Sequence, residues 1–204
     1  MPKNNQQPHH EKYDSPNPIA QKMLKGFMNS ITELTEQIPS DLNSITECGC
    51  GQGHVNQHLE GLFPEANVNG LDIDAPDVKI ANNNKLRQNT NLYIKSIYEI
   101  DKEEQADLIV CCEVLEHLEN PQLALQKMAI LNADYYLFSV PREPLWRILN
   151  FIRGKYMKDW GNTPDHRNHW SSRGFVKFVN QELEVVAVNK PLPWTMVLAK
   201  PKSL

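Results

Sequence analysis

Apolar residues along this chain follow two spacings, one typical of helices and one typical of buried strands. Between Pro18 and Gln37 they recur every three or four positions, which predicts an amphipathic helix. Beyond it, short apolar runs alternate with further helical segments, a pattern typical of an α/β fold. The predicted strands are 45–48, 68–74, 92–94, 106–112, 135–140, 183–188 and 194–199, and the predicted helices are 54–63, 76–87, 121–131, 144–153 and 171–180. Gly154 is the expected C-cap of the helix over 144–153, and Ser171 is the expected N-cap of the last helix.

A glycine-rich stretch follows the first predicted strand. Glu47 lies at the strand end, and Gly49, Gly51 and Gly53 follow at alternate positions. Glycines permit positive φ and close approach of a ligand, so such a loop before a helix suits a nucleotide-like cofactor. The spacing differs from the Gly-x-Gly-x-x-Gly of dinucleotide sites, and no P-loop Gly-Lys-Ser/Thr is present. Glu47 would repel a pyrophosphate, but it can bind an ammonium group.

A second acidic position follows the next predicted strand. Asp72 lies 19 residues after Gly53, where an acid can accept hydrogen bonds from ribose hydroxyls. Asp72 or Asp74 could instead cap the helix that begins near Pro76. Both roles can hold together, with Asp72 on the ribose and Asp74 as the cap.

Two carboxylates and an imidazole follow the predicted strand 106–112. On a helical turn, Glu113, Glu116 and His117 would share one face. Such a set suits Mg²⁺ or Mn²⁺, with Zn²⁺ as an alternative. Two other interpretations stay open: His117 acts as a metal-free general base, or the acids only interact with a helix dipole.

Together these three motifs, which span residues 45–121, resemble class I S-adenosylmethionine-dependent methyltransferases of the type 11 kind. The resemblance implies a Rossmann-like α/β fold with seven strands in the order 3-2-1-4-5-7-6, the last strand antiparallel, and helices on both faces. It also implies S-adenosylmethionine as cofactor. The residues that it implies as cofactor contacts are Glu47, Gly49, Gly51, Gly53, Asp72, Ile73, Ser96, Ile97, Tyr98 and Cys112.

The Glu-x-x-Glu-His turn is similar to that of two methyltransferase families, the ubiquinone-biosynthesis O-methyltransferases and the small-RNA 2′-O-methyltransferases. In both, this turn and a later histidine hold a divalent metal. The resemblance implies Glu113, His117 and His166 as catalytic residues. It implies as metal ligands Glu113, Glu116, His117 and His166, with His169 as the second choice for the last position. Residues 139–147 and 161–164 depart from both families, so the substrate stays open.

Charge is distributed unevenly along the chain. The net charge is −4, which argues against general nucleic-acid binding. Residues 142–177, however, carry 8 Lys/Arg against 3 Asp/Glu and hold three of the four tryptophans. This mixture suits a phosphorylated, aromatic or lipid-like substrate, or association with a membrane surface. The alternative is a solvated basic helix with tryptophans in the core. We expect residues 142–170 to form a substrate lid.

We therefore expect an S-adenosylmethionine-dependent methyltransferase that methylates an oxygen of a small molecule. The alternatives are an RNA 2′-O-methyltransferase, a non-catalytic S-adenosylmethionine-binding module and, third, an NAD-binding Rossmann protein. A flexible arm over 1–16 and a single domain over 17–204 are predicted. The chain has no run of 18 apolar residues and no secretory signal over residues 1–14. Its four cysteines, in two close pairs, suggest reduced thiols in a cytoplasm.

Overall fold

The computed structural model describes residues 16–88, 90–152, 159–160 and 162–203. Within them a seven-stranded sheet has the order β3-β2-β1-β4-β5-β7-β6, with β7 antiparallel to both of its neighbours. The predicted order and the antiparallel last strand are confirmed. The strands are β1 (Ser44–Cys48), β2 (Asn67–Asp72), β3 (Leu92–Ile94), β4 (Leu108–Cys112), β5 (Tyr135–Pro141), β6 (Leu183–Asn189) and β7 (Trp194–Pro201). The register of β6 on β7 shifts between Val185 and Ala187.

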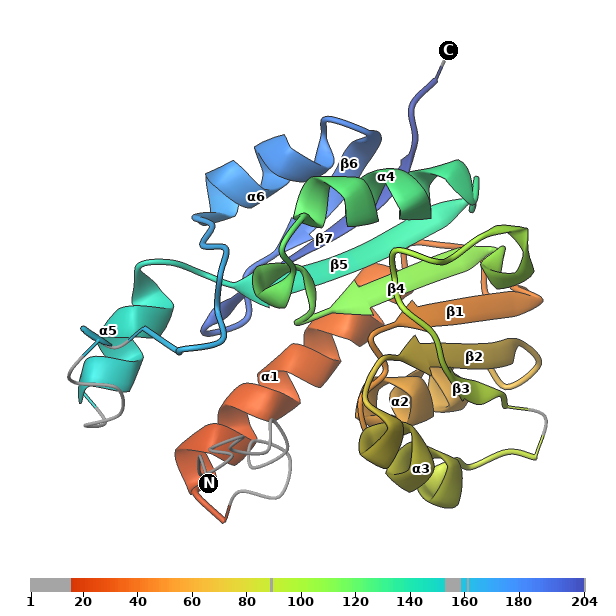
Figure 1. Ribbon diagram of the computed structural model, residues 1–204, viewed down its shortest axis with the longest axis horizontal. Helices are drawn as coiled ribbons and strands as arrows, with labels where there is room; N and C mark the ends of the chain where they lie inside the picture. Colours follow the sequence, from red (N-terminus) through yellow and green to blue (C-terminus); the bar gives the residue numbers. More distant parts are fainter. Residues whose placement is uncertain (1–15, 89, 153–158, 161, 204) are drawn as a thin grey trace, which may run out of the picture.

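Helices cover both faces of this sheet (Figure 1). They are α1 (Pro18–Thr35), α2 (His54–Leu62), α3 (Ala75–Asn84), α4 (Pro121–Ile130), α5 (Leu145–Ile152) and α6 (Ser172–Val179), with 3₁₀ turns η2 (Lys102–Glu104) and η3 (Leu115–His117). No helix among the described residues is long and apolar enough to cross a membrane. Most of the predicted arm and Gly154, the expected end of α5, lie outside the described residues.

Local side-chain chemistry sets several helix ends. The expected caps are confirmed, because Asp74 accepts from the Asp77 N–H at 3.1 Å and Ser171 accepts from the Gly174 N–H at 3.1 Å. The helix α3 ends at Asn84, three residues earlier than predicted. Its last three residues are asparagines, whose short amides compete with the helix for backbone partners.

Two large apolar layers, one on each face of the sheet, hold most of the helices, and a smaller cluster holds α3. Met128 of α4 and Phe175 of α6 pack with Tyr136 on one face. Phe27 and Ile31 of α1 belong to the core on the other face. All five residues of β4 are buried, so this strand lies in the middle of both layers. The four cysteines are buried and form no disulfide among the described residues.

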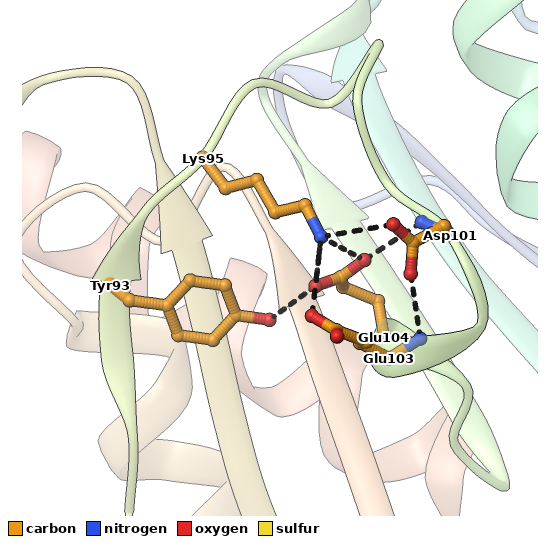
Figure 2. A network of polar contacts seen from close by, with 5 residues as sticks. All are labelled: Tyr93, Lys95, Asp101, Glu103 and Glu104. Carbon is orange, nitrogen blue, oxygen red and sulfur yellow. Dashed lines mark hydrogen bonds and ion pairs between the residues drawn. The ribbon is translucent and has the colours of Figure 1, made fainter.

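A polar network holds the chain that leaves β3 (Figure 2). The buried Glu104 carboxylate accepts from Lys95 Nζ at 2.7 and 2.8 Å and from the Tyr93 hydroxyl at 3.0 Å. It also closes a capping box with Asp101 at the start of η2. The hydrogen bond to Glu104 raises the pKa of Lys95, and burial raises that of Tyr93. This network fixes both ends of the loop that runs from β3 to η2.

We expect Gly70→Ala to lower the free energy of unfolding by about 1–3 kcal/mol, because overpacking in a core is destabilising. A Cβ at this position of β2 would lie 2.8 Å from Cys50 Cβ and 2.8 Å from Leu92 Cδ2. Gly26→Ala is the matched control, since a Cβ there meets nothing within 4 Å. It should raise stability by about 0.5–1 kcal/mol, because alanine favours a helix interior. Urea denaturation measures both, and equal effects would contradict the packing argument.

Candidate functional site

The glycine loop lies at the carboxyl end of β1. Gly49, Gly51 and Gly53 have φ values of 83, 47 and 83°. A Cβ on Gly49 would lie 2.2 Å from Val114 Cγ2, so a side chain there would collide with the segment after β4. The N–H groups of Gly49 and Cys50 both donate to Leu71 O, at 2.7 and 3.0 Å. The loop is thus attached to β2 and turns toward the start of α2.

Two acids flank this loop. Asp72 Oδ2 accepts from the Gly51 N–H at 2.9 Å, and its Oδ1 accepts from the Asp74 N–H at 2.9 Å. Glu47 is 2% exposed, and burial, followed by the charge of Asp72, raises its pKa well above the usual value despite hydrogen bonding to Asn56. Its Oε2 accepts no hydrogen bond from any described residue. A cationic group placed there would stabilise the carboxylate.

The other predicted cofactor contacts differ in exposure. Ile73, which follows β2, is 73% exposed, whereas Ile97 is 6% exposed and packs in the core. Cys112 is buried at the end of β4. The Tyr98 N–H donates to Ser96 Oγ at 3.3 Å, and the Tyr98 hydroxyl accepts from the Asn120 N–H at 3.1 Å. Among Ile73, Ile97 and Cys112, only Ile73 exposes most of its surface.

The predicted helical turn over 113–117 does not form. Glu113 has a φ of 61°, and only Leu115–His117 make a 3₁₀ turn. The Glu113 N–H continues the pairing of β4 with β5 by donating to Ser139 O at 3.1 Å. Its carboxylate accepts from Ser139 Oγ at 3.1 Å and from the indole N–H of Trp194. The prediction that Glu113 shares a face with Glu116 and His117 is therefore wrong.

Three of the four predicted metal ligands do converge. One ligand atom each from Glu116, His117 and His166 lies within 4.8 Å of the others. Glu116 is 1% exposed and His166 is 8% exposed. The His117 Nδ1 donates to the Asp165 carbonyl at 3.0 Å, and its Nε2 lies 3.9 Å from Glu116 Oε1. The second-choice ligand, His169, contacts Asn162 Oδ1 at 2.6 Å and is not part of this group.

Two tryptophans beside this group were not predicted as site residues. The Trp146 ring stacks on His166 at 5.6 Å between centroids, and it lies 6.1 Å from the Trp194 ring. Trp194 in turn contacts Phe27 of α1 at 4.9 Å. The clustering of tryptophans within 142–177 was a usable signal for Trp146. Trp194 instead has the pattern of an ordinary strand residue.

The strand order, with a glycine loop after β1 and an acid at the end of β2, defines the class I methyltransferase fold. Residues 46–133 match the family described as "Methyltransferase domain". The resemblance inferred from the motifs is confirmed: the fold is that of class I methyltransferases, and residues 46–133 are similar to a methyltransferase domain. The chain is also similar to a solved magnesium protoporphyrin IX methyltransferase from Synechocystis, with a TM-score of 0.69 and 16% identity over 94% of each chain.

Two curated relatives are O-methyltransferases. The chain is 26% identical over 116 residues to malonyl-[acyl-carrier protein] O-methyltransferase from Bacillus cereus, covering 57% of this chain and 42% of the relative. It is 29% identical over 116 residues to ubiquinone biosynthesis O-methyltransferase from Shewanella pealeana, covering 54% and 48%. The chain thus spans about half the length of these relatives.

We expect Trp194→Phe to lower the free energy of unfolding by about 1–3 kcal/mol, because it removes a donor from a carboxylate while keeping an aromatic ring. Trp160→Phe is the control, since Trp160 is 76% exposed and a surface change there should stay within about 0.5 kcal/mol. Thermal unfolding followed by circular dichroism compares the two. A Trp194→Phe protein as stable as the control would show that the bond to Glu113 contributes little.

Proposed function

We propose that this protein is an S-adenosylmethionine-dependent methyltransferase that methylates an oxygen of a small molecule with the help of a divalent metal. One observation carries the proposal: Glu116, His117 and His166 converge just past the end of β4. β4 lies next to β1 in a parallel pair, so the carboxyl ends of both strands lie on the same side of the sheet. This group and the glycine loop therefore lie on that side. A methyl donor and an activated acceptor could meet there.

The residues around β1 and β2 suit the methyl donor. Gly51 has open space where a Cβ would lie, which leaves room for the methionine part against the loop backbone, whereas Gly49 and Gly53 let the loop pack closely on Val114 and Ala81. The buried Glu47 carboxylate would bind its ammonium group, which compensates the cost of burying the acid. Asp72 already holds the loop, and its remaining lone pairs can accept from ribose hydroxyls. Exposed Ile73 would cover the adenine, with Ser96 and Tyr98 nearby.

The converging group suits a divalent metal ion. A buried carboxylate with two imidazoles within 4.8 Å is a donor set for Mn²⁺ or Zn²⁺, and acceptor oxygens would complete it. His117 Nδ1 donates to a backbone carbonyl. A hydrogen bond of this kind orients a metal-binding histidine so that its other ring nitrogen faces the metal. Glu113, bound to Trp194 and Ser139, would line the acceptor pocket rather than complete this set.

Chemistry at this site requires an acceptor oxygen that is deprotonated and in line with the sulfonium methyl. A metal bound there would supply the first condition by lowering the pKa of an acceptor hydroxyl. The protein supplies the second by holding donor and acceptor in one geometry, which replaces a bimolecular encounter by a positioned one. Trp146 and Trp194 would form one wall for the acceptor and limit access of water.

The acceptor class is supported by the relatives and by the lid. Both curated relatives described above are named O-methyltransferases. The expected lid, residues 142–170, contains α5 and brings Trp146 onto His166. Figure 1 shows α5 beyond the carboxyl end of β5, where a lid over the site would lie. We therefore propose an aromatic or otherwise flat acceptor with neighbouring oxygens.

The affinity for S-adenosylhomocysteine should depend on the ionisation of Glu47. The ammonium group needs the carboxylate, and the pKa of Glu47 is raised in the free protein. Binding should therefore weaken as pH falls through that pKa, by at most about tenfold per pH unit. Glu47→Gln should bind less tightly and lose this dependence, whereas exposed Glu99→Gln should retain it. Calorimetric titration across pH tests this, and a pH-independent wild type would contradict the role of Glu47.

Metal binding should depend on Glu116. Calorimetric titration of Mg²⁺, Mn²⁺ or Zn²⁺ into protein loaded with S-adenosylhomocysteine should show binding that Glu116→Gln loses. Glu119→Gln is the control, because Glu119 is also acidic and nearby but exposed, and it pairs only with Arg167 among the described residues. Methylation of catechols and vicinal diols should then require the bound metal. Methylation of RNA 3′ ends but of no small-molecule catechol or diol would contradict the small-molecule proposal.

A further inference from the structure

Asn168 joins the His166 segment to the turn after β4. Its side-chain amide donates to Leu115 O at 3.2 Å and to Leu118 O at 2.7 Å. Both N–H groups of the amide are thus used on carbonyls of η3 and the residue that follows it. These partners are 53 and 50 residues away along the chain. The amide therefore makes a long-range connection.

The backbone adds two bonds to the same connection. The N–H groups of Arg167 and Asn168 both donate to Glu116 O, at 2.8 and 2.9 Å. The internal hydrogen bonds of η3 stabilise it little, because a three-residue 3₁₀ turn has few of them and their geometry is poor. Four bonds from residues 167–168 therefore fix the turn that carries Glu116 and His117.

The connection also fixes the two histidines. His166 lies immediately before the residues that make these bonds, and the Asp165 carbonyl immediately before it accepts from His117 Nδ1 at 3.0 Å. Any loosening at Asn168 would move the Asp165 carbonyl away from His117. His117 would then lose the partner that selects its Nδ1–H tautomer and directs Nε2 toward Glu116.

We infer that Asn168 is the positioning residue of the metal group, the residue that brings His166 beside Glu116 and His117 and sets the tautomer of His117. The inference rests on the proposed function. The pair Arg167–Glu119 also connects the two segments, but its side chains are 58 and 78% exposed. Exposed ion pairs contribute little to stability, so this pair cannot replace the hydrogen bonds of the half-buried Asn168 side chain.

Asn168→Asp in the full chain tests this role, because it keeps the shape but replaces the amide donor by an oxygen facing two carbonyls. Mn²⁺ binding to the S-adenosylhomocysteine complex, followed by electron paramagnetic resonance, should weaken by about 10–100-fold. Asn168→Ala, which lacks the repulsion, should give a smaller loss. The His117 imidazole, read by long-range ¹H–¹⁵N NMR without metal, should change from the Nδ1–H tautomer to a mixture.

Asn82→Asp is a matched control. The Asn82 amide also donates to two carbonyls, Val78 O at 3.0 Å and Leu92 O at 2.7 Å, but away from the metal group. It should change stability without changing Mn²⁺ affinity or the His117 tautomer. Unchanged affinity and an unchanged His117 spectrum in Asn168→Asp would overturn the inference. Absence of Mn²⁺ binding in the wild type would instead refute the metal in the proposed function, while the NMR result would still decide the role of Asn168.

Discussion

The attachment of the glycine loop to β2 is the constraint on which the site depends. Leu71 O accepts from two successive N–H groups of the loop, and Asp72 accepts from a third, that of Gly51. Three such bonds in a row require a backbone that turns repeatedly through positive φ, which only glycine adopts at low cost. The close approach of Val114 to Gly49 adds a steric reason for the same choice. The segments that follow the carboxyl ends of β1, β2 and β4 are thereby held together.

The sequence was sufficient for those parts of the fold that depend on local pattern. The strands, the caps at Asp74 and Ser171, and the strand order followed from apolar runs, cap residues and the resemblance of the glycine motif. The predicted end of α3 was three residues too late, because the apolar pattern does not show that the helix stops at its three asparagines. Helix and strand positions are therefore largely encoded within a few neighbouring residues.

The arrangement of the site depended on contacts that local pattern does not contain. The sequence could not show that Glu113 takes a left-handed conformation, because that follows from its pairing with Ser139 and its bond to Trp194. Trp194 lies 81 residues later in the chain. The partners of His117 likewise come from a segment 48 residues away. The identities of Glu116, His117 and His166 were predictable by resemblance, but the bonds that bring them together were not.

The two edges of the sheet have a consequence for association between molecules. An edge strand with unpaired N–H and C=O groups can recruit another chain, and proteins blunt it with short strands, charges or bulges. The edge strand β3 has only three residues and is followed by the Lys95–Glu104 ion pair. On the other edge, β6 carries Glu184 and the register shift at Val185. Each edge strand is therefore a poor template for fibril-like growth. The two outer strands, β3 and β6, can stay uncovered without promoting pairing between molecules.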